Sequence, residues 1–221
     1  MPGSRPSPQI SASLPAVVLG GGLSRRMGSP KFSLQLGGQT MLTRIVARLR
    51  PQVTSVAVNL NADPAGAIDR GVLVIADTVP GFLGPLAGVL TAMRHVAATN
   101  PAASHVVVVP TDTPFFPDNL VTRMVAGLTE HQQIAVAASN GQMHPLFGLW
   151  PVALADELET FLTSDPKRRV RAFIERHPSV TVDFPLIATA EGAFDPFFNV
   201  NTPEDLTDAE QWLRFFEDDK T

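Results

Sequence analysis

The chain of 221 residues contains no cysteine. This absence excludes disulfide bonds, catalysis by a thiolate, and zinc or iron–sulfur centres that cysteines would hold. No apolar run approaches the ~20 residues that would cross a bilayer, and the Ser- and Pro-rich residues 1–14 lack the apolar stretch of a signal peptide. We therefore expect residues 1–14 to be a disordered leader, residues 15–221 to form one domain, and the protein to be cytoplasmic without a membrane partner.

The sequence also lacks a basic excess, since 17 Lys and Arg residues stand against 21 Asp and Glu, a formal net charge of −4. This balance argues against a general nucleic-acid binder. Positive charge is instead local: Arg25, Arg26 and Lys31 share one stretch, and Lys167–Arg171 form another. The second run is typical of a solvated face, although it could attract an anionic partner.

The most informative stretch is Leu19–Lys31, in which an apolar run leads into three consecutive glycines. Glycine lets a ligand approach the backbone closely, so that exposed N–H groups can point at an anion. The arginines and the lysine add charged donors suited to phosphate. The spacing matches neither the P-loop nor the dinucleotide-binding motif. We expect this loop to bind a nucleoside triphosphate, with a tight strand-to-helix turn as the alternative.

Apolar runs alternate with helix-like patterns along most of the chain. This order predicts an α/β fold, a Rossmann-like three-layer sandwich whose mainly parallel sheet carries helices on both faces. The predicted strands cover 16–19, 53–59, 72–76, 105–109, 134–138, 145–150 and 180–184, and the alternation at 32–36 is also strand-like. The predicted helices cover 41–49, 85–98, 119–128 and 153–162, with a short one near 170–174 and a last one beginning at 203.

Polar residues follow several of these strands. The glycine loop, Asn59, Asp77 and Asp112 all fall at carboxyl ends of strands, which is where parallel sheets bind ligands. Asp112 follows a run of four valines, so its carboxylate should be held rigidly and suits Mg²⁺, which takes one or two protein carboxylates and substrate phosphates. A turn or capping role is the alternative for Asn59, Asp77 and Asp112.

Several ordered motifs together resemble one family. Leu19–Lys31 is similar to the glycine-rich signature of nucleotidyltransferases that act on the pterin of molybdenum cofactor, the MobA-like family of molybdenum cofactor guanylyltransferases. The similarity continues at Gly84–Gly88, Pro110–Pro114, His144–Pro145 and Asn199–Pro203. The resemblance implies a nucleotide-diphospho-sugar transferase-like fold, Mg²⁺ as cofactor, and GMP transfer from GTP to the terminal phosphate of molybdopterin or Mo-molybdopterin with release of pyrophosphate.

The resemblance also implies roles for individual residues. Arg25, Arg26, Lys31 and Asp112 would be catalytic, and Asp112 would be the metal ligand. Asn199 and Asn201 would lie on the molybdopterin side, although asparagine is also common at such a turn for purely local reasons. His144 is more typical of a structural or pterin-lining histidine than of a general base. The residues expected to bind GTP are Leu19, Gly20, Gly21, Gly22, Lys31, Asn59, Asp77, Gly84 and Asp112.

Other functions remain open on the sequence. A cytidylyltransferase acting on the same pterin is the nearest alternative, followed by a non-catalytic carrier of the cofactor and by a sugar-phosphate nucleotidyltransferase. The expected partners are the two substrates, molybdenum-insertion proteins and apo-molybdoenzymes, and the protein is expected to be a monomer. The phenylalanine pairs at 115–116, 197–198 and 215–216 are expected in the core rather than in recognition.

Overall fold

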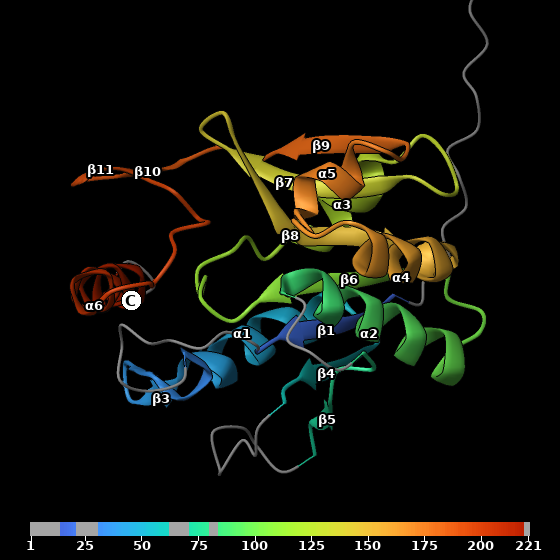
Figure 1. Ribbon diagram of the computed structural model, residues 1–221. Helices are drawn as coiled ribbons and strands as arrows, with labels where there is room; N and C mark the ends of the chain where they lie inside the picture. Colours follow the sequence, from blue (N-terminus) through green and yellow to red (C-terminus); the bar gives the residue numbers. More distant parts are fainter. Residues whose placement is uncertain (1–13, 21–30, 62–70, 80–83, 219–221) are drawn as a thin grey trace, which may run out of the picture.

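A seven-stranded sheet forms the centre of the protein in the computed structural model, which describes residues 14–20, 31–61, 71–79 and 84–218 (Figure 1). The strand order is β5-β4-β1-β6-β8-β7-β9. The strands are β1 (Pro15–Leu19), β4 (Ser55–Asn59), β5 (Leu73–Ile75), β6 (His105–Pro110), β7 (Ile134–Ser139), β8 (Gln142–Pro151) and β9 (Ser179–Asp183).

The sheet is mainly parallel, as predicted. Strands β5, β4, β1 and β6 run in one direction, and β7 and β9 are parallel to each other. Only β8 is reversed among these strands, since it is antiparallel to both β6 and β7. The β7–β8 connection is the hairpin that Asn140-Gly141 predicts, with φ values of 47° and 73° at these two residues.

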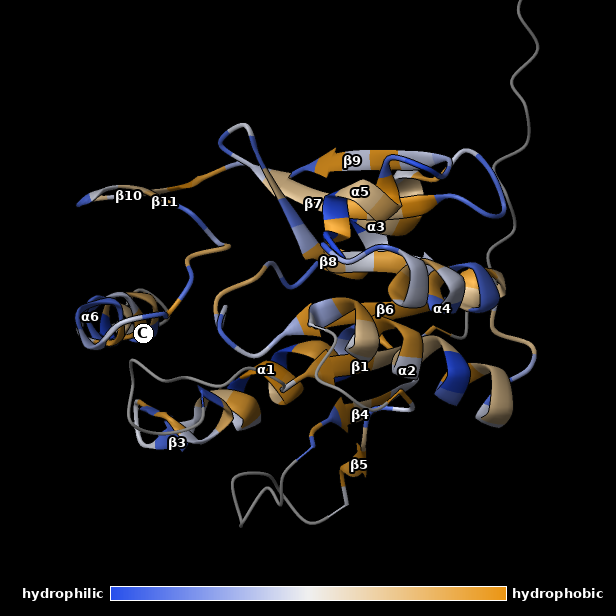
Figure 2. Cartoon of the chain, in the orientation of Figure 1, coloured by the Kyte–Doolittle hydropathy of each residue, from blue (hydrophilic) through white to orange (hydrophobic). Residues whose placement is uncertain are grey.

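Helices cover both faces, which confirms the three-layer prediction (Figure 1). On one face, α1 (Met41–Leu49) and α3 (Leu120–Gly127) pack on inward-facing valines and alanines of the sheet. On the other face lie α2 (Pro85–Thr99), α4 (Ala155–Ser164) and α5 (Val170–Ile174). Figure 2 shows the apolar residues concentrated between these layers. Among the described residues, no helix combines the length and the apolar character needed to cross a membrane.

Local sequence signals explain where several helices begin. Thr40 caps α1, because its side chain accepts a hydrogen bond from the Thr43 amide at 3.1 Å. Pro85 occupies the first turn of α2, after Gly84 at a φ of +80°. The last helix, α6 (Pro203–Asp218), begins after Thr202, whose hydroxyl accepts from the Asp205 amide at 3.2 Å. The Asp205 carboxylate accepts in turn from the Thr202 amide at 2.9 Å, a reciprocal cap.

A few predicted elements differ from the structure. Residues 32–36 are not one strand: a 3₁₀ turn, η1 (Lys31–Ser33), precedes a short hairpin of β2 (Gln35–Leu36) and β3 (Gln39–Thr40). Strand β4 begins at Ser55 rather than at residue 53, since a second 3₁₀ turn, η2 (Arg50–Gln52), follows α1. Helix α3 begins at Leu120 rather than at residue 119, and Asp118, just before it, pairs with Arg48 at 3.2 Å.

Two further features were not predicted. A third 3₁₀ turn, η3 (Val152–Leu154), precedes α4. A small hairpin of β10 (Ile187–Thr189) and β11 (Gly192–Phe194) follows β9.

Leu14, the first described residue, and α6, the last helix, both pack on the folded body. Leu14 is buried in the core and its carbonyl accepts a hydrogen bond from the Thr54 amide at 3.0 Å; residues 1–13 lie outside the described part. Helix α6 packs through Leu213 and Ala209 on a separate apolar cluster with Leu36 and Phe115. In Figure 1, α6 therefore lies beside the β2–β3 hairpin, beyond the end of the main sheet. The predicted phenylalanine pairs are buried or partly buried.

Candidate active site

The carboxyl ends of four adjacent parallel strands meet at one edge of the sheet. Leu19, the last residue of β1, pairs with Asn59 on one side and with Pro110 on the other, and Asn59 pairs with Ile75. Gly20, Asn59, Asp77 and Asp112 follow or end these strands, so they lie at the same edge, as predicted. Gly21, Gly22, Arg25 and Arg26 lie outside the described residues.

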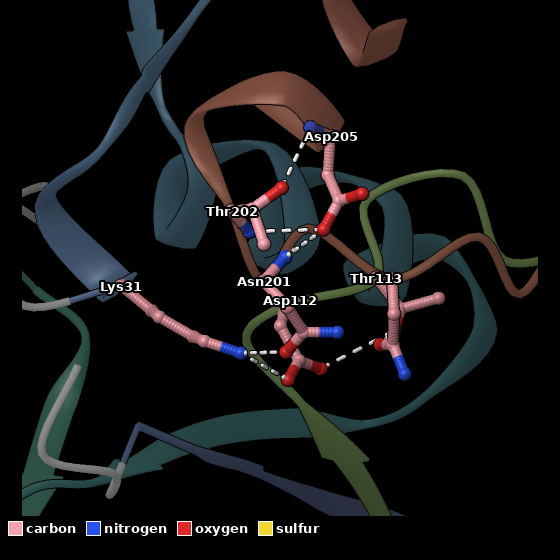
Figure 3. A network of polar contacts seen from close by, with 7 residues as sticks. Lys31, Asp112, Thr113, Asn201, Thr202 and Asp205 are labelled. Carbon is pink, nitrogen blue, oxygen red and sulfur yellow. Dashed lines mark hydrogen bonds and ion pairs between the residues drawn. The ribbon is translucent and has the colours of Figure 1, made fainter. Parts of the chain in front are cut away.

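One polar cluster forms around Asp112 (Figure 3). The Lys31 ammonium donates to Asp112 Oδ2 at 2.9 Å and also to Asn201 Oδ1. The side chains of Lys31 and Asp112 are each about one-fifth exposed, which leaves both accessible to a ligand. In the sequence, Lys31 is separated from Asp112 by 81 positions and from Asn201 by 170 positions.

Thr113 and Asn199 complete this cluster. The Thr113 hydroxyl lies 3.3 Å from Asp112 Oδ1 and 2.5 Å from Asn199 Oδ1. The Val200 amide, between the two asparagines, donates to the Asp112 carbonyl at 2.8 Å. Asn199 and Asn201 therefore belong to the same cluster as Lys31 and Asp112.

The cap of α6 fixes the backbone next to Asn201. The Asp205 carboxylate accepts from the Asn201 amide at 2.8 Å as well as from the Thr202 amide. Figure 3 shows Thr202 and Asp205 above the Lys31–Asp112 pair, with Asn201 between them and the pair. The start of α6 thus sets the position of Asn201.

A second polar group lies at the ends of β4 and β5. The Asn59 amide donates to Asp77 Oδ1 at 2.9 Å and to the Ile75 carbonyl at 3.2 Å. Asn61 Nδ2 donates to Asp77 Oδ2 at 2.7 Å, and the Asp77 amide donates back to Asn61 Oδ1 at 2.8 Å. Asn59 is only 4% exposed, so one of the hydrogen bonds that position the Asp77 carboxylate comes from a buried side chain.

Two glycines permit the close packing at this edge. A Cβ on Gly20 would lie 2.9 Å from Leu60 Cγ and 3.2 Å from the Asn59 carbonyl oxygen. A Cβ on Gly88, in α2, would lie 2.7 Å from Asn59 Oδ1 and 2.9 Å from Leu19 Cδ2. A side chain at position 20 or 88 would therefore force its neighbours to shift, and Gly84 has a positive φ that favours glycine.

The cluster around Asp112 has the chemistry of a hard-cation site. A carboxylate and the amide oxygens of Asn199 and Asn201 are the ligand types that Mg²⁺ prefers. The described residues contain no group of three or more His, Asp or Glu that could enclose a metal by themselves. A single carboxylate still fits Mg²⁺, because that ion keeps several waters and is commonly shared with substrate phosphates.

His144 belongs to a different network, in which Ser139 and Asp195 were not anticipated from the sequence. Ser139 Oγ lies 2.7 Å from His144 Nε2 and 2.7 and 2.8 Å from the two Asp195 carboxylate oxygens. Burial lowers the pKa of His144, an effect that the Asp195 charge partly offsets. The Asp-Pro-Phe-Phe stretch before Asn199 is the only sequence signal that could have indicated Asp195.

The basic run between α4 and α5 has one clear structural role. Arg168 adopts a φ of 44° and its Nε donates to the Leu162 carbonyl at 2.9 Å, near the end of α4. Such a contact satisfies a carbonyl that the helix itself leaves unpaired. Lys167, Arg169 and Arg171 are exposed, as the sequence predicts for a solvated face.

Comparison with known proteins relates this geometry to one family. Residues 16–181 match the MobA-like NTP transferase domain. A protein of Rhizobium meliloti named molybdenum cofactor guanylyltransferase is 61% identical over 204 residues, covering 92% of this chain and 94% of that protein. A protein of the same name from Sinorhizobium fredii is 59% identical, covering 94% and 95%.

Solved structures support the same fold. Molybdopterin-guanine dinucleotide biosynthesis protein A from Archaeoglobus fulgidus superposes with a TM-score of 0.68 at 24% identity, covering 91% of this chain and 99% of that one. Rv0371c of Mycobacterium tuberculosis, solved as a complex with manganese, has a TM-score of 0.65 at 19% identity, covering 90% and 98%. With this fold and these relatives, the chain belongs to the MobA-like NTP transferase family, among proteins named molybdenum cofactor guanylyltransferase.

Proposed function

We propose that this protein transfers GMP from GTP to the terminal phosphate of molybdopterin or Mo-molybdopterin, with release of pyrophosphate. The observation that supports this most directly is the convergence of Lys31, Asp112 and Asn201 at the carboxyl edge of the sheet. A cation, a carboxylate and amide oxygens at one accessible point suit a metal-complexed polyphosphate. The choice of substrates follows from the name of the similar proteins, molybdenum cofactor guanylyltransferase.

The reaction requires charge control rather than a strong base. A phosphate monoester has a second pKa near ~6, so the acceptor is already a competent nucleophile at neutral pH. The acceptor oxygen attacks the α-phosphorus, the α–β bridging bond breaks, and pyrophosphate carries the electron pair away. Lys31 donates to the triphosphate, Asn199 and Asn201 face the acceptor, and Asp112 provides the protein's carboxylate ligand for a divalent cation. Mg²⁺ bound there would neutralise charge on the phosphate oxygens.

The glycine loop supplies the remaining anion contacts in this proposal. Gly20 starts the loop from β1 and donates its own amide to the Asn59 carbonyl at 2.9 Å, so the phosphate contacts fall to the amides of Gly21 and Gly22. Arg25 and Arg26 add guanidinium donors, which bind phosphate in bidentate fashion. Gly84 places the amino-terminal end of α2 at the same edge, where its backbone amides favour negative charge.

The Asn59–Asp77 group provides the basis for choosing guanine. Guanine presents two neighbouring N–H donors on its Watson–Crick edge, whereas cytosine presents one donor beside an acceptor nitrogen. A carboxylate only accepts hydrogen bonds, so Asp77 favours guanine over cytosine. Asn59 and Asn61 hold both oxygens of Asp77 in place for this contact.

A side-by-side transfer assay tests the proposal. Purified protein is incubated with Mg²⁺, molybdopterin and either GTP or CTP, and released pyrophosphate and the dinucleotide product are measured. We expect product with GTP and at least about tenfold less with CTP. Preference for CTP would make the protein a cytidylyltransferase, and molybdopterin binding without nucleotide consumption would make it a carrier; either result refutes GMP transfer.

The setting of the protein is part of the proposal. We place it in the cytoplasm and expect it to act as a monomer. Molybdenum-insertion proteins and apo-molybdoenzymes would be its partners, because the first deliver the acceptor and the second receive the product.

A further inference from the structure

The segment that carries Asn199 and Asn201 is fastened to the sheet at a point away from Asp112. That fastening joins the β7–β8 hairpin to residues 195–201 and consists of Ser139, His144, Asp195 and Phe197, which we call the hairpin clamp. Ser139 is fully buried, and its hydroxyl has three polar partners. None of the four residues contacts the Lys31–Asp112 pair in the hydrogen bonds of the described residues.

The number of available hydrogens determines which group donates and which accepts in each hydrogen bond of the clamp. A serine hydroxyl has one hydrogen to donate and two lone pairs to accept. The Asp195 carboxylate can only accept, so the Ser139 hydrogen points to Asp195 at 2.7–2.8 Å. His144 Nε2 lies 2.7 Å from Ser139 Oγ. Because the serine hydrogen is used for Asp195, Nε2 must carry a hydrogen of its own and donate it to Ser139 Oγ. Removing the hydroxyl would leave both His144 and Asp195 without this partner.

Asp195 also organises the backbone that follows it. Its Oδ1 accepts from the Phe197 amide at 2.9 Å, and its carbonyl accepts from the Phe198 amide at 3.0 Å. The Phe197 ring stacks on the His144 ring, with centroids 4.5 Å apart and an interplanar angle of 15°. The same ring packs against Phe147 and Phe184 in the core.

The other end of the segment is fixed at the candidate active site. The Val200 amide donates to the Asp112 carbonyl, and Val200 is fully buried. The chain from Asp195 to Val200 is thus held at both ends, with exposed Asn199 and Asn201 on either side of the second anchor. Their amide oxygens reach Thr113 and Lys31.

We propose that the hairpin clamp positions Asn199 and Asn201 beside Asp112, and that Asp195 is a positioning residue for binding the phosphate-bearing acceptor. This inference rests on the proposed function, which places the acceptor on the asparagine side of the cluster. Loosening the clamp displaces the asparagines but leaves in place Gly20, Asn59 and Asp77 on the GTP side, since separate hydrogen bonds fix these three residues.

The test compares three variants of the full chain. Ser139→Ala and Asp195→Asn weaken the clamp, and Ser104→Ala is the matched control. Ser104 Oγ also lies 2.9 Å from a histidine nitrogen, that of His105, but at the opposite end of the sheet, where β6 begins. Melting temperatures establish that each variant folds; if Asp195→Asn does not, Ser139→Ala still decides the matter, because it removes a single oxygen.

The expected result is a split between the two substrates. In Ser139→Ala and Asp195→Asn, the KM for molybdopterin rises about tenfold, as expected for misplaced hydrogen-bonding groups. The Kd for GTP with Mg²⁺, measured by calorimetry, stays within about twofold of the parent value, and Ser104→Ala changes neither constant. An unchanged molybdopterin KM, an equal loss of GTP affinity, or the same rise in Ser104→Ala overturns the proposal.

A second measurement separates this inference from the proposed function. Amide hydrogen exchange over residues 197–201 requires no substrate and reports directly on the fastening of the segment. Faster exchange in Ser139→Ala and Asp195→Asn, but not in Ser104→Ala, supports the clamp even if the parent protein transfers no GMP. Unchanged exchange in both clamp variants overturns it.

Discussion

The close approach of α2 to Asn59, on the proposed nucleotide side of the site, gives a quantitative prediction for Gly88→Ala. The new methyl group would lie 2.7 Å from Asn59 Oδ1, about 0.7 Å inside the distance at which ordinary van der Waals contact begins. Asn59 is buried and cannot swing into solvent. Either α2 moves away from β4 or the Asn59 side chain turns, and the second change breaks its bond to Asp77.

We expect Gly88→Ala to have a small effect on stability and a larger effect on GTP binding. Replacing glycine within a helix gains about 1 kcal/mol of helix propensity, whereas overpacking a core costs about 1–3 kcal/mol. The free energy of unfolding should therefore fall by no more than about 2 kcal/mol, a drop in Tm of less than about 8 °C for a chain of this size. Losing a hydrogen bond to a carboxylate affects binding more, so we expect the KM for GTP to rise about tenfold.

The assay measures GTP kinetics and thermal unfolding for Gly88→Ala beside Gly127→Ala. Gly127 ends α3 on the opposite face of the sheet, and its new Cβ would lie 2.7 Å from a Val182 methyl, so the control carries similar crowding. In an Asn59→Ala background, Gly88→Ala should add no further loss of GTP affinity, because the two changes act through one side chain. A normal GTP KM in Gly88→Ala, or fully additive losses, would refute the reasoning.

The remaining predictions concern the charged cluster, pH and the last helix. Lys31→Ala and Asp112→Ala should each lower kcat by about tenfold or more, while Asp118→Ala, which removes an exposed partner of Arg48, should not; near-normal transfer in both site variants would exclude the assigned roles. Burial lowers the pKa of His105 from its ordinary value of 6.5. As the pH falls below 6.5, this histidine is protonated in the unfolded chain before it is protonated in the folded protein, so the free energy of unfolding declines. Denaturant titrations at about pH 7.5 and pH 5.5 should show this decline, and His105→Gln should reduce it; an equal decline in the variant would contradict the assignment. Thr202→Ala should cost about 1 kcal/mol through loss of the α6 cap, measured as a lower denaturation midpoint, and an unchanged midpoint would show that Asp205 alone holds the helix start.

Much of the fold follows from local patterns in the sequence. Continuous apolar runs such as His105–Val109 predict buried strands, and the Asn140-Gly141 pair predicts the hairpin between β7 and β8. The difficult elements are those whose structure depends on neighbours. Residues 32–36 alternate like a strand but form a 3₁₀ turn and a short hairpin, because Leu36 packs under α6, which lies far along the chain.

The candidate site could be predicted only in part. Asn59, Asp77 and Asp112 each follow a strand, and parallel strands present their carboxyl ends together, so their common location is a consequence of strand order. Ser139 and Asp195 gave no comparable signal. Their meeting depends on β7 lying at one side of the sheet and on the path of the chain after β11, neither of which a local pattern encodes.

The sequence alone determined the alternation of strands and helices, the glycine-rich exit from β1 and the polar residues that end the parallel strands. Only the tertiary structure brought Asn199 and Asn201 to Lys31 and Asp112, and only it fastened their segment to the β7–β8 hairpin. The physical reason is the distance along the sequence over which each interaction acts. Backbone periodicity acts over a few residues, whereas contacts across 170 positions exist only once the reversed strand β8 and the return through β11 have set the path of the chain.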